Sequence, residues 1–160
     1  MRVGQGVDAH RFSDDPGRPL VLGGVVVPGA AGLEGHSDAD AATHALCDAL
    51  LGAAGLGDLG RHFPDSDPAF AGASSLGLLD TCCGLARAAG FTAANADVTI
   101  VAQVPRLGAA LDEMAAVLTA VLGAPVNVKA TTTEQMGAIG RGEGIAATAV
   151  VLLYEQGDRR

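Results

Sequence analysis

The stretch DADAATHALCDALLGAA, residues 38–54, contains the clearest helix signal in this chain of 160 residues. Its apolar side chains, from Ala42 to Ala53, recur every three or four residues and so form a stripe along one face of a helix. Gly52 and Gly55 stand near the end of the segment, where glycine commonly terminates a helix. The segment predicts a helix packed against a core, and the rest of the fold is predicted outward from it.

Shorter segments on both sides of this helix have the patterns of strands and of two further helices. Strands are expected at residues 2–8, 95–104, 126–130 and 145–154, a hairpin or bent strand pair at 20–28, and helices at 75–89 and 105–122, with Pro105 in the first turn. This order favours an α/β fold, a single-domain α/β sandwich over residues 1–160 in which helices cover one side of a sheet. Residues 155–160 are expected to form a frayed tail.

Small residues dominate the composition, because Ala and Gly occupy 54 of the 160 positions and only five residues are aromatic. A monomer of this kind has a thin core, which favours association into a closed oligomer. The 49% hydrophobic content excludes intrinsic disorder, and the net charge of −8 argues against nucleic-acid binding. On charge alone, an anionic substrate is also unexpected. No apolar run reaches the roughly 18 residues of a membrane span.

The cysteines and the N-terminal residues favour a reducing, cytoplasmic location. Cys47, Cys82 and Cys83 are odd in number and form no CxxC pair, so neither a disulfide framework nor a thiolate zinc site is indicated. We interpret them as small buried side chains. The N-terminal residues include no hydrophobic segment of the kind that a secretory signal requires.

Asp8 and His10 stand two residues apart on the first predicted strand, so both side chains point to the same face and can reach one ion. Asp40, His44 and Asp48 lie at four-residue spacing on the predicted helix, where a solvated polar face is the alternative interpretation. We interpret His44 as the third ligand of an Asp/His/His set with one open position, which is typical of a catalytic zinc or similar ion. Asp40 or Asp48 is then placed to orient the His44 ring.

Gly4 and Gly6 have the spacing that opens a dinucleotide-binding turn, but residues 12–17 interrupt the chain before a helix can follow. A Rossmann site is therefore rejected. We interpret the two glycines instead as keeping the surface of the strand narrow beside the metal site.

The segment ahead of the central helix carries His36, Ser37 and Asp38. Ser37 or Asp38 suits the helix N-cap, whereas a helix N-terminus flanked by His36 and Ser37 also offers hydrogen-bond donors to an anion. Both interpretations remain open from the sequence.

A loop rich in Gly, Pro and Asp follows the central helix at residues 57–72. Its carboxylates, Asp58, Asp65 and Asp67, either shape turns or accept hydrogen bonds from substrate hydroxyls. His62 is interpreted as an exposed loop histidine and not as a ligand.

Two polar segments near the C-terminus also have two interpretations each. Thr131 and Glu134 have the spacing of a capping box, but the hydroxyls at residues 131–133 also suit a phosphate, and Glu134 suits a second hard cation that bridges phosphates. Arg141 is either a turn residue or a bidentate phosphate donor. Together the motifs indicate a metal site beside several oxyanion-binding loops.

At this point the sequence closely resembles the 2-C-methyl-D-erythritol 2,4-cyclodiphosphate synthase family, over essentially the whole chain to about Tyr154. So many matches in the right order make coincidence remote. The matching motifs are GVDAH (6–10), HSDAD (36–40), HALCDALLGA (44–53), GDLG (57–60), FPDSDPAF (63–70), NVKATTTE (127–134) and GRGEG (140–144).

The resemblance implies a homotrimer with an active site at each junction between neighbouring subunits. It implies that Asp8, His10 and His44 bind a catalytic divalent ion, typically zinc, and that Glu134 helps to hold a second ion, magnesium or manganese. His36 and Thr132 match residues that stabilise the transition state. Further implied substrate contacts are Ser37, Asp58, Gly60, Phe63, Asp65 and Asp67 on the erythritol-phosphate side, and Ala102, Gln103, Val104, Pro105, Arg106, Leu107, Gly108, Thr131 and Thr133 on the cytidine-nucleotide side.

The implied activity is that of a phosphorus–oxygen lyase in the non-mevalonate isoprenoid pathway. It converts 4-diphosphocytidyl-2-C-methyl-D-erythritol 2-phosphate to the cyclic 2,4-diphosphate and releases CMP. Ala138 stands where many family members carry a Phe that lines the central cavity of the trimer near the nucleotide contacts. We expect the smaller side chain to widen that cavity and to weaken binding of an isoprenoid diphosphate there.

Two other functions are compatible with the residues. A metal phosphohydrolase would use the ion to activate water and would release orthophosphate. A non-catalytic trimeric metal-binding protein would carry isoprenoid diphosphates along its axis and would release no CMP.

Overall fold

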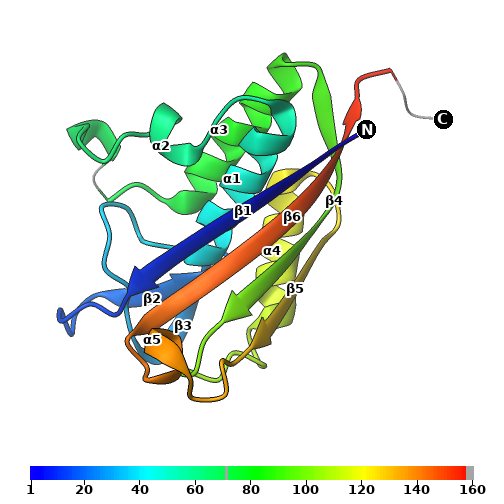
Figure 1. Ribbon diagram of the computed structural model, residues 1–160. Helices are drawn as coiled ribbons and strands as arrows, with labels where there is room; N and C mark the ends of the chain where they lie inside the picture. The colour runs from blue at the N-terminus through cyan, green and yellow to red at the C-terminus, as the bar shows by residue number, and fades with distance from the viewer. Residues whose placement is uncertain (71, 158–160) are drawn as a thin grey trace.

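The protein has a layer of helices packed on one face of a four-stranded sheet, as the computed structural model describes it for residues 1–70 and 72–157 (Figure 1). The strand order is β1-β6-β4-β5. β1 (Arg2–Arg11) and β4 (Phe91–Val101) both pair antiparallel with β6 (Gly144–Glu155), and β4 runs parallel to β5 (Val126–Thr131). β1 and β5 therefore form the two edges of this sheet.

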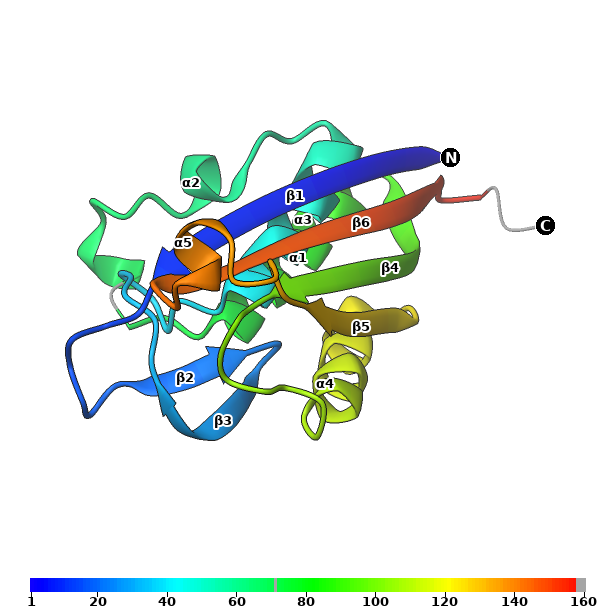
Figure 2. The same cartoon turned by 60° about the horizontal axis from the view of Figure 1, so that its bottom comes forward.

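Three long helices cover one face of the sheet, which confirms the predicted α/β sandwich. They are α1 (Ala41–Ala54), α3 (Ser75–Ala88) and α4 (Leu111–Leu122). α1 lies at the centre of the molecule, against β1 and β6 on one side and α3 on the other. β2 (Pro19–Leu22) and β3 (Val25–Ala31) form a separate two-stranded sheet (Figure 2), and the short elements are α2 (Leu59–His62), a 3-10 turn (Pro68–Phe70) and α5 (Gly137–Gly140).

The predicted boundaries between β4 and α4 were wrong. The strand ends at Val101 instead of 104, and the helix begins at Leu111 instead of Pro105. Pro105 and Gly108 both disfavour a helix interior, whereas Asp112 and Glu113 supply the acidic first turn that a helix N-terminus favours. Residues 102–110 therefore form a connection that lines a cavity described below.

The C-terminal end of β6 extends further than predicted. Glu155 still pairs with Phe91, and the backbone N–H of Gln156 donates to the carbonyl oxygen of Gly90 at 2.7 Å. The predicted tail at residues 155–160 therefore begins with two paired residues, and residues 158–160 lie outside the described residues.

Gly4 and Gly6 allow α1 to approach β1 closely. A Cβ atom at Gly4 would lie 2.0 Å from the carbonyl oxygen of Ala49, and one at Gly6 would lie 2.0 Å from that of Ala45. Both are backbone atoms in the middle of α1, so no side-chain rotation relieves the overlap. The interpretation that these glycines keep the strand surface narrow is confirmed.

The face of the sheet that points away from the helices exposes large apolar side chains. Val3, Val7 and Val150 are 69%, 56% and 45% exposed, and they alternate along β1 and β6 with residues buried under α1. Surface apolar side chains that gather on one face typically mark a contact surface. Among the described residues, no helix is both long enough and apolar enough to cross a membrane.

We predict that Gly6→Ala destabilises the protein by about 1–3 kcal/mol, because the new methyl group forces α1 away from β1. The free energy of unfolding in urea measures this effect. Gly52→Ala is the matched control, because a Cβ at Gly52, also on α1, meets no atom within 4 Å. Alanine also favours a helix over glycine by up to about 1 kcal/mol, so the control should be neutral or stabilising. Equal effects of the two substitutions would contradict the packing argument.

Candidate active site

Asp8, His10 and His44 meet where β1 passes over the first turns of α1. Asp8 and His10 lie on the helix-facing side of β1, as the two-residue spacing predicted, and His44 points toward them from α1. Asp8 Oδ2 lies 2.9 Å from His10 Nε2 and 3.0 Å from His44 Nδ1, and the two ring nitrogens are 3.4 Å apart. The structure therefore brings all three predicted ligands together.

The donor atoms of this cluster fit a divalent metal ion. His10 Nδ1 lies 2.7 Å from the carbonyl oxygen of Glu34, which can only accept, so a neutral His10 ring presents the lone pair of Nε2 to the cluster. A carboxylate and imidazole lone pairs this close repel one another unless a proton or a metal ion lies among them. Metal–ligand bonds of about 2.0–2.1 Å in a tetrahedral zinc site place ligand atoms about 3.3 Å apart, which is close to the separations here.

The electrostatics of the cluster also favour a cation. Burial raises the pKa of the Asp8 carboxyl, but hydrogen bonds and charges from His10 and His44 outweigh it and hold that pKa well below its usual range. The hydrogen bond to Asp8 in turn raises the pKa of His10. Asp8 therefore stays ionised and supplies the negative charge of the site.

Neither Asp40 nor Asp48 touches the His44 ring, so the prediction that one of them orients it was wrong. Asp40 is fully buried and accepts hydrogen bonds from the backbone N–H groups of Gly23, Gly24 and Thr43 at 2.7–3.0 Å. It is the N-cap of α1, which corrects the choice of Ser37 or Asp38. The Asp40 carboxylate caps this helix start by accepting from the N–H of Thr43, and its negative charge disfavours a bound anion there.

A cavity of about 290 Å³ opens beside the metal cluster. It gathers His10 and His44 with the predicted catalytic residue His36 and three predicted substrate residues, Ser37, Phe63 and Asp65, and with Gly35, Leu59, Phe70 and Leu78. The Phe63 and Phe70 rings meet edge to face at 5.3 Å and form an apolar part of its wall. The cavity thus joins a candidate metal site to one carboxylate, one hydroxyl and the exposed imidazole of His36, whose Nε2 lies 3.4 Å from the carbonyl oxygen of Asp67.

Three predicted substrate residues do not line this cavity. Asp58 caps α2 by accepting from the N–H of Arg61 at 2.9 Å, and Gly60 lies within α2. Asp67 Oδ1 accepts from the N–H of Ala69 at 2.9 Å, which is the turn-shaping alternative given above. The interpretation of His62 as an exposed loop histidine was wrong: it is the last residue of α2, it is half-buried, and its Nε2 lies 2.9 Å from the carbonyl oxygen of Leu56.

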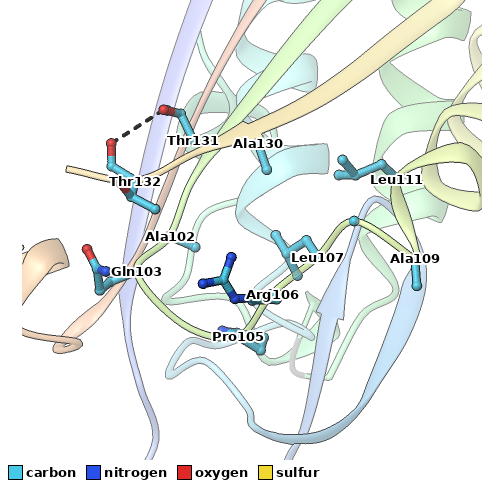
Figure 3. Close-up of a pocket in the computed structure, with 11 residues that line it drawn as sticks. Ala102, Gln103, Pro105, Arg106, Leu107, Ala109, Leu111, Ala130, Thr131 and Thr132 are labelled. Carbon is cyan, nitrogen blue, oxygen red and sulfur yellow. Dashed lines mark hydrogen bonds between the residues drawn. The ribbon is translucent and has the colours of Figure 1, made fainter. Parts of the chain in front are cut away.

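A larger cavity of about 520 Å³ lies at the opposite edge of the sheet, beside β5 (Figure 3). The Arg106 guanidinium lies among the lining residues in Figure 3, and Leu107 and Leu111 contribute apolar side chains. Val104, which is 51% exposed, is the one residue of the predicted 102–108 segment that does not line it. The lining comprises Ala102, Gln103, Pro105, Arg106, Leu107, Gly108, Ala109, Leu111, Ala130, Thr131 and Thr132, of which Ala109, Leu111 and Ala130 were not predicted.

The loop after β5 is not the capping box that the spacing of Thr131 and Glu134 suggested. Thr131 is the last residue of the strand, and Glu134 and Gln135 have positive φ angles of 51° and 64°. The backbone N–H of Glu134 donates to Thr132 Oγ1 at 3.1 Å, and the Thr132 hydroxyl donates to Glu134 Oε1 at 2.9 Å. This turn holds Thr132 beside the larger cavity, with the exposed Glu134 carboxylate next to it.

The remaining predicted residues lie around α5. Thr133 Oγ1 donates to the carbonyl oxygen of Met136 at 2.7 Å, and Ala138 lies within α5. Arg141 follows α5, and its Nε donates to Glu143 Oε1 at 2.6 Å. None of Thr133, Ala138 and Arg141 lines either cavity, and Glu134 lies outside the Asp8/His10/His44 cluster.

Sequence reasoning missed two residues behind His44. Ser75, the first residue of α3, lies 2.8 Å from His44 Nε2, and Asp38 accepts hydrogen bonds from both the backbone N–H and the hydroxyl of Ser75. No periodicity links positions 31 residues apart, so only the packing of α3 against α1 could identify this contact.

The fold and the site define an α/β protein with a candidate divalent-metal site beside a polar cavity. Comparison with known proteins narrows this class, because residues 1–154 match the model of the YgbB family. The chain therefore belongs to the YgbB family, as the motifs predicted.

Full-length relatives support the same assignment. The chain is 57% identical over 156 residues to the 2-C-methyl-D-erythritol 2,4-cyclodiphosphate synthase of Symbiobacterium thermophilum, across 96% of this chain and 98% of that protein. The bifunctional IspDF of Campylobacter jejuni superposes with a TM-score of 0.91 and 42% identity over 96% of this chain, which spans 42% of that larger chain. The CDP complex of IspF from Plasmodium falciparum has a TM-score of 0.83 and 30% identity, over 97% of this chain and 96% of that one.

Asp48 lies near the cluster without touching it, and its role is testable by pH. Burial raises the pKa of its carboxyl, although Oδ1 accepts from the N–H of Leu59 at 2.7 Å. A native pKa above the unfolded value of about 3.9 means that ionisation costs stability as pH rises through this range. Asp48→Asn keeps an acceptor for Leu59, so the variant should gain stability relative to the parent between pH 4 and pH 7.

Urea unfolding of the metal-free parent and variant at both pH values measures this difference. Asp80→Asn, at an exposed position of α3, controls for the loss of one negative charge. The prediction would be contradicted if the stability difference were independent of pH. It would also be contradicted if the Asp48→Asn variant became less stable relative to the parent as pH rises.

Proposed function

We propose that this protein is a metal-dependent cyclodiphosphate synthase. It catalyses intramolecular phosphoryl transfer in 4-diphosphocytidyl-2-C-methyl-D-erythritol 2-phosphate, forming 2-C-methyl-D-erythritol 2,4-cyclodiphosphate in isoprenoid precursor biosynthesis. Family membership makes the chain an enzyme, and its relatives carry this activity in their names. The observation on which the proposal rests is the convergence of Asp8, His10 and His44 beside a polar cavity.

In the reaction, an oxygen of the 2-phosphate forms a bond to the β-phosphorus of the same molecule. The bond from that phosphorus to the bridging oxygen breaks, and CMP leaves with the oxygen, as in a phosphorus–oxygen lyase. Because the phosphate nucleophile is already ionised at neutral pH, the protein needs to fold the substrate and to offset its charge, and it needs no nucleophile of its own. None of the residues that line the two cavities is a cysteine, which is consistent with this chemistry.

Asp8, His10 and His44 would hold zinc, and Glu134 would hold magnesium or manganese together with the substrate phosphates. When bound, these ions polarise the β-phosphoryl oxygen and offset charge on the α- and β-phosphates. His36 and Thr132 donate hydrogen bonds to the phosphoryl group in the transition state. The exposed His36 ring lines the cavity beside the metal and Thr132 lines the larger cavity, which supports these roles. The Thr132 hydroxyl donates to Glu134 in the structure, and it would turn to the phosphoryl group when Glu134 binds the ion.

In this proposal the two cavities bind different ends of the substrate. Ser37, Phe63 and Asp65 contact the erythritol phosphate in the cavity beside the metal. Asp58, Gly60 and Asp67 do not line this cavity in one chain, and we assign them to the same part of the substrate because they belong to the same loop region. The larger cavity accepts the cytidine nucleotide, which its apolar side chains support. The CDP complex of the Plasmodium falciparum relative has the same fold and is consistent with a nucleotide site. The remaining proposed contacts are Ala102 to Gly108, Thr131, Thr133, Ala138 and Arg141.

The proposal includes a homotrimer whose active sites lie between subunits. Within one chain, the metal cluster lies at the β1 edge and the larger cavity at the β5 edge, and the two cavities share no lining residue. Three strand spacings, about 14 Å, separate those edges. The exposed valines at positions 3, 7 and 150 offer an apolar face for association. One cavity of each chain would then meet the other cavity of its neighbour.

The proposal also includes a central cavity on the trimer axis and a cytoplasmic location for the protein. The Arg141–Glu143 pair beside α5 supports a polar entrance to a central cavity, where an isoprenoid diphosphate would bind. Ala138 widens that cavity and weakens such binding. Three free, buried cysteines support a reducing, cytoplasmic environment.

CMP release from the diphosphocytidyl substrate tests the reaction. His44→Ala should lower CMP release by about 10²–10³-fold, because a metal ion contributes several kcal/mol to transition-state stabilisation. A chelator should have the same effect on the parent, and zinc with magnesium should restore it. His62→Ala removes a histidine outside the cluster and should stay within a few-fold of the parent. Phosphorus NMR that finds orthophosphate as the main product would favour a phosphohydrolase and refute the cyclase.

Mixed oligomers test whether each site spans two subunits. His44→Ala lacks a ligand at the metal side and Thr132→Ala lacks a group at the nucleotide side, so each variant alone should be nearly inactive. Random association of the two chains leaves about a quarter of the junctions with both sides intact. Co-expressed, co-purified mixtures should therefore recover roughly that share of parental CMP release. Activity no higher than that of the separate variants would refute a shared site.

A further inference from the structure

A hydrogen-bonded chain leads away from the metal cluster on the far side of the His44 ring. His44 Nε2 lies 2.8 Å from Ser75 Oγ, and the Ser75 hydroxyl donates to Asp38 Oδ1. The backbone N–H of Ser75 donates to the other oxygen of the same carboxylate, Asp38 Oδ2, at 2.9 Å. Ser75 is completely buried at the start of α3, so solvent offers no other partner to its hydroxyl.

The number of protons decides the direction of each bond in this chain. A serine hydroxyl has one proton, and the Asp38 carboxylate can only accept it. Ser75 Oγ is therefore left with lone pairs, and it must accept a proton from His44 Nε2. An imidazole that is protonated at Nε2 and neutral carries its lone pair at Nδ1. Nδ1 is the atom that lies 3.0 Å from Asp8 Oδ2, inside the metal cluster.

Ser37 is the competing acceptor, and its contacts are weaker. Its Oγ lies 3.2 Å from His44 Nε2 and also receives the backbone N–H of Ala39 at 3.2 Å. Ser37 is only half-buried and lines the cavity beside the metal, where the proposed function assigns it to substrate. It has no carboxylate behind it to direct its own proton.

We infer that Ser75 and Asp38 are positioning residues for the metal site. They hold the His44 ring in one tautomer and one orientation, so that Nδ1 is ready to bind the ion before the ion arrives. This inference rests on the metal site of the proposed function and adds two residues to it. It also makes α3 part of the site, because Ser75, the first residue of that helix, accepts the hydrogen bond from His44 Nε2. Ser37 remains free to bind substrate.

Zinc affinity of the purified full-length protein tests the inference independently of turnover. Competition with a chromophoric chelator gives the affinity, and the visible spectrum of the Co²⁺-loaded protein reports ligand geometry. Ser75→Ala should lower zinc affinity about 10–100-fold, as loss of a group that orients a histidine ligand typically does. Asp38→Asn should lower it in the same direction and alter the Co²⁺ spectrum. The double variant should lose little more than Ser75→Ala, because both substitutions break one chain.

Ser37→Ala is the matched control, since it removes the other hydroxyl near Nε2. Its zinc affinity should stay within about 3-fold of the parent, although its KM for substrate should rise. Thermal unfolding of the metal-free variants separates positioning from folding: a positioning role lowers the zinc-induced rise in Tm. If Ser75→Ala and Asp38→Asn bind zinc as the parent does, or if Ser37→Ala alone loses it, the inference is refuted. A parent that binds no zinc would refute the metal assignment itself, and this inference with it.

Discussion

The close approach of α1 to β1 is the constraint on which the rest of the structure depends. Gly4 and Gly6 leave no side chain between the strand and the helix backbone, and every other residue of this face of β1 must then fit against α1. Asp8 and His10 follow on the same face, where His44 stands next to Ala45, the residue against which Gly6 packs. The 3.0 Å contact between Asp8 and His44 is therefore a consequence of backbone packing. The geometry of the candidate metal site is therefore set by the packing of β1 against α1.

Burial of α1 on all sides explains both what the sequence pattern predicted and where it failed. The apolar stripe predicted a helix that packs on one face, but every residue of α1 except Asp48 and Gly52 is buried. A helix placed between a sheet and α3 needs small residues all round, which the alanines supply. The four-residue spacing correctly placed His44 and Asp48 on one helix, but Asp40 is the N-cap ahead of that helix. The spacing also could not say which of these side chains would be enclosed or what each would contact.

Part of the candidate metal site was predictable because its geometry is local, whereas the approach of His44 to Asp8 depends on the packing of α1 against β1. Two-residue spacing on a strand and one histidine on a helix define directions that secondary structure alone supplies. The contacts of Asp40 with Gly23 and Gly24, and of Ser75 with His44, depend on how distant elements pack, and no local pattern records them. The prediction of a helix from Pro105 was wrong for a related reason. A proline that suits the start of a helix also suits an irregular connection such as residues 102–110.

The net charge of −8 is a sum over the whole chain and does not describe the charge of any one site. Several carboxylates accept hydrogen bonds that fix the local structure. Asp40 and Asp48 accept from backbone N–H groups, Asp38 accepts from Ser75, and Asp58 and Asp67 hold turns. At the metal cluster one carboxylate faces two imidazoles, so a divalent ion makes the local charge positive. An anionic substrate is then attracted to this cluster, although the chain as a whole carries a negative charge. Net charge bears on partners that cover a large surface, whereas a small phosphate is selected by the charge of its own site.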